Sequence, residues 1–328
     1  MLVIKLILLI FTIQISNFYA SEKELNPYNF LLKEILLGEA KKNLVKDRYS
    51  IPNKKALSHY EDGEGKAIKI ELATKFKGSP DDWSSKNQRW ELGSNKNPAG
   101  LISLNEPVFI KYTFKLSSLA NHKNIDGTFF QITGNKRGTA GAVHKVYPWI
   151  SLRYDYEDDK KSHNYLLDLK YLNLKDHKYR NSISYKFDLL TDSGLSVAEN
   201  EFERFQTYDF KIIPSDNEDG EIIVWKNGKV MLQLYGRNYW EAHAFGFRVG
   251  HYRWLEDWKG NINKAPNAYT IIKEFGYSSD CLEILSTDQC EWKPYKNKRK
   301  SRSKFEFRVS NKGNPPSFEE IIKYYKKY

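Results

Sequence analysis

The sequence predicts an all-β protein in which two antiparallel sheets pack face to face as a sandwich. Three observations predict this class. Short segments in the middle of the chain repeatedly alternate apolar and polar residues, no long helical pattern separates these segments, and an Asn-Gly pair joins two of them. Aromatic residues make up 15% of the 328 residues, which suits a strand-rich core and also suits a surface that stacks against sugars.

The alternation is clearest in 108–116, where Val108, Ile110, Tyr112, Phe114 and Leu116 share one face and Lys111, Thr113 and Lys115 share the other. Further strands are expected at 67–76, 127–133, 148–156, 165–174, 183–190, 208–213, 221–225, 229–235, 244–252 and 269–275. The pair Asn227-Gly228 predicts a tight hairpin between two of these strands. Periodicity alone does not distinguish a jelly roll from an immunoglobulin-like sandwich.

Residues 1–20 form an apolar run with one early Lys and a small residue, Ala20, at its end. This pattern predicts a signal peptide, with the cut at or a few residues from Ala20, although the segment could instead persist as an anchor. Since no later segment is apolar enough to cross a membrane, we expect a mature chain without a transmembrane span. The signal peptide predicts a secreted or periplasmic protein, and we also expect a monomer.

Three further regions follow the signal peptide. Residues 21–58 are expected to be a short helical extension, because Phe30, Leu31, Ile35, Leu36 and Leu44 recur among Lys and Glu. Residues 59–292 carry the strands, and residues 293–328 form a basic tail. The tail holds twelve basic and three acidic side chains, so nine of the eleven net positive charges of the chain lie in it.

The charge of the tail favours polyanionic partners such as acidic polysaccharides, although a merely solvated tail has the same composition. No nucleic-acid motif is present, and we expect no nucleic-acid partner. The only two cysteines, Cys281 and Cys290, have eight residues between them, which in an exported protein predicts a small disulfide loop. Two thiols without a nearby His make a poor metal site.

Three segments place polar side chains on one face of a strand. Arg89 and Glu91 share a face, with Trp90 and Leu92 on the other. Alternation likewise groups Gln131 and Thr133 with Phe129, opposite Phe130 and Ile132, and groups Arg248 and Tyr252 with Gly246 and Gly250, opposite His251. Because glycine within a strand often marks the close approach of a ligand, we expect open space beside Arg248.

The order of these segments resembles that of the jelly-roll polysaccharide lyases. Arg89-Trp-Glu91-Leu resembles their Arg-x-Glu-Leu strand, Gln131-Ile-Thr133 their Gln-Ile-His strand, and Phe247-Arg248-Val-Gly250-His-Tyr252 their Phe-Lys-x-Gly-x-Tyr strand. The resemblance covers residues 60–292 and is greatest to the heparin-lyase-I-like group, with family-seven alginate lyases and glucuronan lyases as relatives. It implies a concanavalin-like β-jelly-roll sandwich and cleavage of a uronate-containing polysaccharide by β-elimination, the reaction of a carbon–oxygen lyase.

The resemblance also implies roles for individual residues. Arg89 and Gln131 are expected to neutralise the uronate carboxylate, and Tyr252 to act as base and then as acid. A tyrosine pKa of about 10 falls when a cation lies nearby, which would help Tyr252 to ionise. Arg248, Thr133 and Glu91 are expected to contact the substrate. Two further candidates come from the residues alone: His144 lies in a Gly-rich stretch, 134–146, that could fold over the site, and Arg153 is either a ligand of substrate carboxylates or a surface residue. His144 is also a second candidate for the base, whereas His251 is expected to face away from the site.

Thr133 departs from the family pattern, because a histidine at this position often serves as the base. If Tyr252 acts alone, the C5 proton and the C4 oxygen should lie on the same side of the sugar ring. This is the arrangement in glucuronate and mannuronate, whereas iduronate and guluronate place the two groups on opposite sides.

Two other functions remain open at this stage. The loss of the histidine is compatible with a non-catalytic carbohydrate-binding protein of the same fold. A glycoside hydrolase needs two carboxylates across the site, and no strand of the Glu-x-Asp-x-x-Glu type is present. The elimination requires no cofactor, and a structural calcium ion is compatible with the sequence but is not indicated by any residue pattern.

Overall fold

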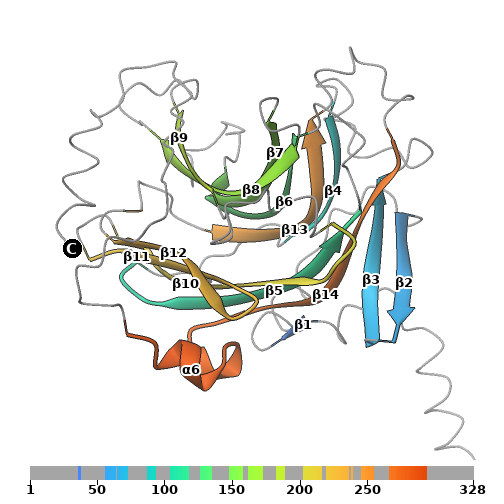
Figure 1. The fold of residues 1–328 in the computed structure, drawn as a ribbon. Helices are drawn as coiled ribbons and strands as arrows, with labels where there is room; N and C mark the ends of the chain where they lie inside the picture. Colours follow the sequence, from blue (N-terminus) through green and yellow to red (C-terminus); the bar gives the residue numbers. More distant parts are fainter. Residues whose placement is uncertain are drawn as a thin grey trace, which may run out of the picture.

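The structure is a computed structural model. Two curved sheets pack on each other (Figure 1). It describes residues 36–37, 56–63, 65–72, 87–93, 104–117, 126–134, 148–157, 162–172, 182–188, 202–215, 219–235, 238, 245–254 and 266–293. The signal peptide at 1–20, most of the extension at 21–58 and residues 294–328 of the basic tail lie outside these ranges and stay predictions.

The lower sheet in Figure 1 has eight strands in the order β12-β11-β10-β5-β14-β3-β2, with β1 pairing in parallel with β14. The other pairings in this sheet are antiparallel. The strand bounds are β1 Leu36–Leu37, β2 Leu57–Asp62, β3 Gly65–Leu72, β5 Val108–Leu116, β10 Gln206–Ile213, β11 Glu221–Lys226, β12 Lys229–Tyr235 and β14 Ala268–Ser278.

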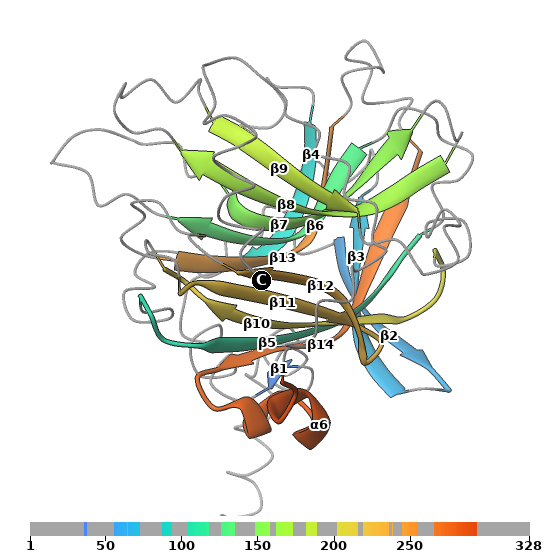
Figure 2. The ribbon, with the colours of Figure 1, turned by 60° about the vertical axis from the view of Figure 1, so that its left-hand side comes forward.

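The upper sheet has six antiparallel strands in the order β4-β13-β6-β7-β8-β9. Their bounds are β4 Asn87–Gly93, β6 Asp126–Gly134, β7 Pro148–Glu157, β8 Ser162–Leu172, β9 Ser182–Asp188 and β13 Phe245–Trp254. The views in Figures 1 and 2 both show this sheet bent into a trough whose convex side faces the eight-stranded sheet. We call the side turned away from the eight-stranded sheet the outer face.

The main core fills the space between the sheets and is rich in aromatic rings. Tyr112, Phe114, Phe129, Phe130 and Phe275 are fully buried in it, and their rings meet in stacked, tilted or edge-to-face pairs with centroids 4.5–6.2 Å apart. The predicted apolar face of 108–116 is the face of β5 that enters this core. The fold is therefore the predicted β-jelly-roll sandwich.

The hairpin prediction is confirmed: Asn227 and Gly228 both have positive φ, and they join β11 to β12. The prediction for 21–58 differs from the structure where the chain is described, because Leu36–Leu37 form strand β1 rather than helix, and β2 begins at Leu57. Pairing with β14 supplies hydrogen bonds to these two leucines that a local sequence pattern does not show.

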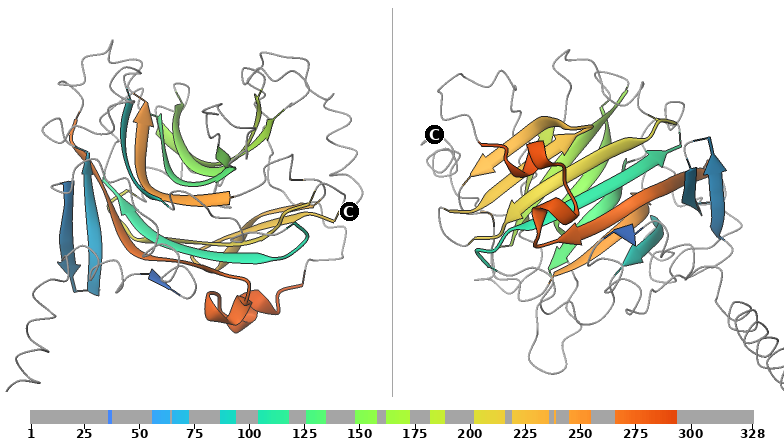
Figure 3. Two further views of the ribbon diagram at one scale, coloured as in Figure 1. Left: turned by 180° about the vertical axis from the view of Figure 1, so that it is seen from behind. Right: turned by 90° about the horizontal axis from the view of Figure 1, so that it is seen from below.

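The predicted disulfide is confirmed and belongs to a second, smaller core. Cys281 and Cys290 are bonded, with their Cα atoms 5.7 Å apart. They lie in a short segment formed by a 3-10 turn, Cys281–Glu283, and by α6, Thr287–Cys290, which Figure 3 shows lying across the far side of the eight-stranded sheet. The segment covers Phe109, Ile223 and Trp225.

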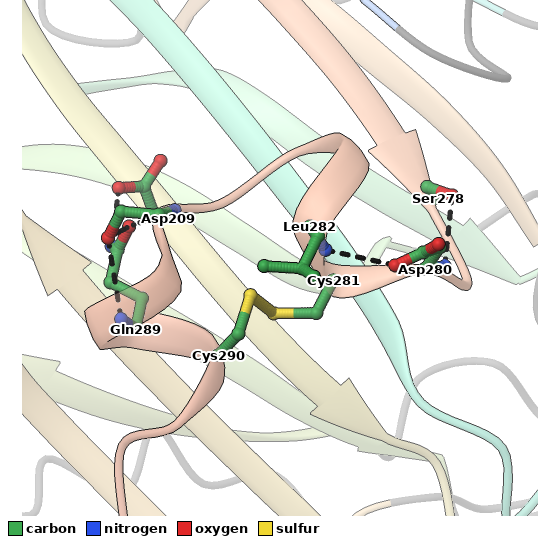
Figure 4. The surroundings of a disulfide bond; sticks show 8 residues. Asp209, Ser278, Asp280, Cys281, Leu282, Gln289 and Cys290 are labelled. Carbon is green, nitrogen blue, oxygen red and sulfur yellow. Dashed lines mark hydrogen bonds between the residues drawn. A yellow bond between two sulfur atoms is a disulfide. The ribbon is translucent and has the colours of Figure 1, made fainter.

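Polar contacts hold both ends of this segment (Figure 4). Asp280 caps the 3-10 turn by accepting from the backbone N–H of Leu282, and Ser286 caps α6 through a capping box with Gln289. The side chain of Gln289 also donates to Asp209 of β10, at 2.7 Å. The disulfide thus fixes a segment that covers apolar side chains of the eight-stranded sheet. The sequence did not predict this second core.

Candidate active site

Three strands that are distant in sequence lie side by side at one edge of the six-stranded sheet. β13 pairs with β4 on one side and with β6 on the other. In this register Tyr252 lies opposite Arg89, and Arg248 lies opposite Gln131. The three segments that resemble the lyase strands are therefore direct neighbours.

Alternation along these strands decides which side chains enter the core. Trp90 of β4, Ile132 of β6, and Phe247 and Val249 of β13 are fully or almost fully buried between the sheets. Their neighbours Arg89, Glu91, Gln131 and Arg248 consequently point to the outer face. The predicted faces of Arg89, Trp90 and Glu91 are confirmed by this arrangement, whereas the side chain of Leu92 lies outside the described residues.

On the outer face the polar side chains contact one another. The amide of Gln131 donates a hydrogen bond to the carboxylate of Glu91. Arg89 and Arg248 lie 3.8 Å and 3.7 Å from the same carboxylate oxygen of Glu91. The guanidinium carbon of Arg89 is 5.1 Å from the ring centre of Tyr252, a cation–π distance. We call these five residues the arginine cluster.

Members of the arginine cluster differ in exposure. The side chains of Arg89 and Arg248 are 27% and 29% exposed, whereas that of Glu91 is only 5% exposed. Two partly exposed guanidinium groups therefore lie beside the buried carboxylate of Glu91. Counted over these five residues, the formal charge is +1, which favours an anionic group such as a uronate carboxylate.

A bulge in β13 shapes the sheet beneath the cluster. The register of β13 with β6 shifts between Val249 and Tyr252, and Gly250 has a φ of 145°. A Cβ atom at Gly250 would lie 2.3 Å from the backbone oxygen of Trp90. The expectation that glycine leaves room for a ligand is wrong at this position, because the bare backbone accommodates strand β4 instead.

A second register shift, between Thr128 and Phe130, changes the faces expected for β6. Both Phe129 and Phe130 are buried in the core, so Phe129 does not share a face with Gln131 as strict alternation predicts. Thr128 instead lies opposite both Tyr252 and Arg153. Sequence analysis missed Thr128, because a bulge carries no recognisable side-chain pattern.

From inside the core, Tyr112 of the opposite sheet supports this region. Its hydroxyl donates to the backbone oxygen of Phe129 at 3.2 Å. Burial raises the pKa of Tyr112 well above its usual value, and a hydrogen bond with the backbone of Gly250 opposes that shift. Nothing in the sequence distinguishes Tyr112 from the other core tyrosines, so its contact with both bulged strands was not predicted.

His251 faces the core, as expected. Its ring nitrogens lie 2.5 Å from the hydroxyl of Tyr154 and 3.2 Å from the hydroxyl of Thr270. Burial, together with the nearby charge of Arg253, lowers the pKa of His251 to about 3. The imidazole is therefore neutral at physiological pH and belongs to a buried hydrogen-bond network between the sheets.

Arg153, a predicted substrate contact, is paired with two acids in the structure. Its guanidinium donates to Asp168 and to Asp155, each at 3.0 Å, and its side chain is only 13% exposed. Burial would lower the pKa of Arg153, but the two carboxylates outweigh burial and raise it. The pair with Asp168 joins β7 to β8, and contact of Arg153 with a substrate stays a prediction.

The structure describes only the backbone of Thr133 and does not describe His144. Thr133 lies in β6 with its backbone opposite Gly246 of β13, two residues along the strand from the Gln131–Arg248 pair. His144 lies outside the described residues and stays a prediction. Within the described part of the chain, no group of three His, Cys, Asp or Glu side chains is arranged to hold a metal ion, and no helix is long and apolar enough to cross a membrane.

Comparison with known proteins shows the fold. No family model matches the sequence, and no curated protein matches it. Among solved structures, the endo-β-1,4-glucuronan lyase of the fungus Trichoderma reesei is similar, with a TM-score of 0.50 at 14% identity over 73% of this chain and 92% of the other.

Two alginate lyases are also similar. The marine family-seven enzyme of Zobellia galactanivorans has a TM-score of 0.40 at 15% identity, covering 67% of this chain and 82% of the other. A further alginate lyase, solved with dimannuronate, has a TM-score of 0.41 at 14% identity, covering 65% and 74%. The similarity to the glucuronan lyase shows that the chain has the jelly-roll fold found in polysaccharide lyases. The arginine cluster lies on the outer face of its six-stranded sheet.

Proposed function

We propose that this protein is a polysaccharide lyase that cleaves a uronate-containing glycan by β-elimination at the arginine cluster. The observation that carries the proposal is the position of Tyr252, a partly exposed tyrosine held against Arg89, on one face with Arg248 and Gln131. This combines a group able to transfer a proton with cations able to bind a carboxylate. Residues 1–20 support an exported enzyme, and the basic tail supports an anionic polymer as its partner.

The first requirement of the reaction is a more acidic C5 proton. When Arg89 and Arg248 pair with the uronate carboxylate, negative charge from the breaking C5–H bond can spread onto that carboxylate as an enediolate. The amide of Gln131 lies beside them and can add a hydrogen bond. The charge surplus of the cluster suits one carboxylate per site.

Tyr252 carries out the proton transfers. Its phenolate, stabilised by the guanidinium of Arg89, takes the C5 proton; the electron pair of the C5–H bond forms the C4–C5 double bond, and the C4–O4 bond breaks. The phenol then returns the proton to the departing O4, so the tyrosine ends as it began. One residue reaches both atoms most directly when they lie on the same side of the ring, as in glucuronate and mannuronate.

The test offers glucuronan, polymannuronate, polyguluronate and heparin side by side, and follows the ultraviolet absorbance of the conjugated double bond. We expect cleavage of glucuronan or polymannuronate. We expect Tyr252→Phe to lower turnover at least about 100-fold while folding and binding persist, because proton transfer is lost but the cations remain. Tyr269→Phe is the matched control, since this tyrosine is partly exposed on the opposite sheet.

Three results would contradict the proposal. Near-normal turnover of the Tyr252→Phe variant would remove this residue from the mechanism. Cleavage of polyguluronate or heparin alone would require a separate base, with His144 the first to mutate. Tight binding of one polymer without any cleavage would instead identify a carbohydrate-binding protein.

A further inference from the structure

We propose that Glu91 is a positioning residue, which holds Arg89, Arg248 and Gln131 in place for the substrate carboxylate without touching the substrate itself. This inference rests on the proposed function and deepens it. It replaces the expectation that Glu91 contacts the sugar, because only 5% of its side chain is exposed. An acid so nearly buried lies beneath the binding surface rather than on it.

Glu91 contacts every side chain that the proposed reaction uses to bind a carboxylate. These contacts join three strands: Arg89 lies on the same strand as Glu91, Arg248 on β13, and Gln131 on β6. Arg89 and Arg248 carry the same charge on neighbouring strands, and each lies within ion-pair distance of Glu91. The buried carboxylate offsets the repulsion between the two guanidinium groups.

The ion pairs of Glu91 with the two arginines are longer than direct hydrogen bonds. Direct charge-assisted hydrogen bonds between Arg and a carboxylate are about 2.7–2.9 Å long, whereas the pairs with Glu91 measure 3.8 Å and 3.7 Å. In these two pairs, the attraction therefore orients the guanidinium groups without closing on Glu91. A uronate carboxylate arriving from the solvent side can make the shorter contacts.

Glu91 also fixes the orientation of the Gln131 amide. An ionised carboxylate only accepts hydrogen bonds, so the NH₂ group of Gln131 must face Glu91 and its carbonyl oxygen must face elsewhere. Removal of the charge would let this amide rotate by half a turn. The substrate would then meet a mixture of donor and acceptor orientations.

The test is Glu91→Gln, with Glu221→Gln as its matched control. Glu221 is also nearly buried, with 9% of its side chain exposed, and it pairs with Lys211 at 2.6 Å in the eight-stranded sheet. On the polymer that the wild type cleaves, we expect Glu91→Gln to lower kcat roughly 10- to 100-fold through misplaced guanidinium groups, without raising KM. Glu221→Gln should leave both constants unchanged.

A binding measurement separates this inference from the proposed function. In the Tyr252→Phe background, calorimetry with uronate oligosaccharides at low and high salt should show a steeper salt dependence for Glu91→Gln, because the cluster gains one net positive charge. Glu91→Asp keeps that charge and should restore the original salt dependence, but only part of kcat, since its side chain is shorter.

A raised KM with unchanged kcat would show that Glu91 serves substrate binding alone and would overturn the inference. So would an unchanged salt dependence of binding. Loss of activity accompanied by a drop in Tm well beyond that of Glu221→Gln would reveal a purely structural role. Absence of cleavage by the wild type, with the expected change in salt dependence, would reject the elimination but keep the charge balance assigned to Glu91.

Discussion

His251 and Tyr252 are consecutive residues of β13, yet they lie in opposite environments. Tyr252 is partly exposed on the outer face beside Arg89, whereas His251 is completely buried and hydrogen-bonded to Tyr154 and Thr270. Because side chains of a strand alternate between the two faces of its sheet, one residue serves the surface and the next serves the core. The histidine expected from the family at Thr133 is thus not replaced by His251.

The buried imidazole predicts a specific dependence of stability on pH. The pKa of His251 is about 3 in the folded protein, against about 6.5 in an unfolded chain. Below pH 6.5 the unfolded state therefore binds a proton that the folded state does not, and folding stability falls by about 1.4 kcal/mol per pH unit as the pH decreases toward 3. This stability is fully present above pH 6.5.

His251→Gln should remove this dependence while keeping a polar side chain in the network. Urea unfolding at pH 5.0, 5.5, 6.0 and 7.5 would give the free energy of unfolding for both proteins. We expect a flatter profile for the variant in this range, where most carboxylates have not yet titrated. Parallel profiles would mean that His251 becomes protonated without cost in the folded protein.

At the scale of the element, the bulge in β13 determines how closely β4 approaches. Gly250→Ala would place a methyl group 2.3 Å from the backbone oxygen of Trp90 and would force a side chain onto a φ of 145°. Backbone strain of this kind alone costs about 1–3 kcal/mol. We expect a loss of at least about 2 kcal/mol in the free energy of unfolding, with reduced activity because Arg89 moves with β4.

Denaturant unfolding and steady-state kinetics of the same preparation would measure both effects. Gly63→Ala is the control, since a Cβ atom there meets nothing within 4 Å. Wild-type stability of Gly250→Ala would show that β4 can shift freely, and the geometry of the arginine cluster would then not depend on this glycine.

The strands themselves could largely be predicted, because burial on one side imposes alternation that is visible in the sequence. The predicted segments 108–116 and 229–235 coincide with β5 and β12. β2, with the sequence LSHYED, was missed because it is an edge strand with largely exposed side chains, so no apolar alternation marks it. The two-residue strand β1 depends entirely on its pairing with β14.

The sequence predicted which residues belong to the candidate site better than it predicted how they are arranged. Arg89, Gln131, Arg248 and Tyr252 were expected to act together through a resemblance, and the structure places them on neighbouring strands. Pairing between distant strands leaves no trace in local periodicity. The pairing of Arg153 with two aspartates was hidden for the same reason, because Asp168 comes from the next strand.

At the scale of the whole molecule, the sandwich has two apolar layers of different size. The main core lies between the sheets, and the smaller one lies under the disulfide segment on the far side of the eight-stranded sheet. Trp292 contributes to the smaller core by meeting Trp225 edge to face, with ring centroids 6.0 Å apart. The arginine cluster is on the opposite outer surface, so the disulfide segment does not contribute to it directly.

Replacement of Cys281 and Cys290 by Ala should therefore affect stability but not activity. The bond closes a short loop, which by chain entropy stabilises the fold by about 2–3 kcal/mol. We expect a lower Tm in thermal melts and unchanged kcat and KM at temperatures well below the transition. Loss of activity in the folded variant would indicate that the disulfide segment influences the six-stranded sheet.

The chain order of β4, β6 and β13 also determines when the arginine cluster can exist. β4 is made early and β13 late, and β13 must insert between β4 and β6 before Arg89 meets Tyr252 or Glu91 meets Arg248. Contacts between such distant segments carry a large loop-closure entropy and form slowly during folding. A partly synthesised or partly folded chain therefore lacks the cluster altogether, and any binding or chemistry that depends on these five residues requires that the last strands have docked.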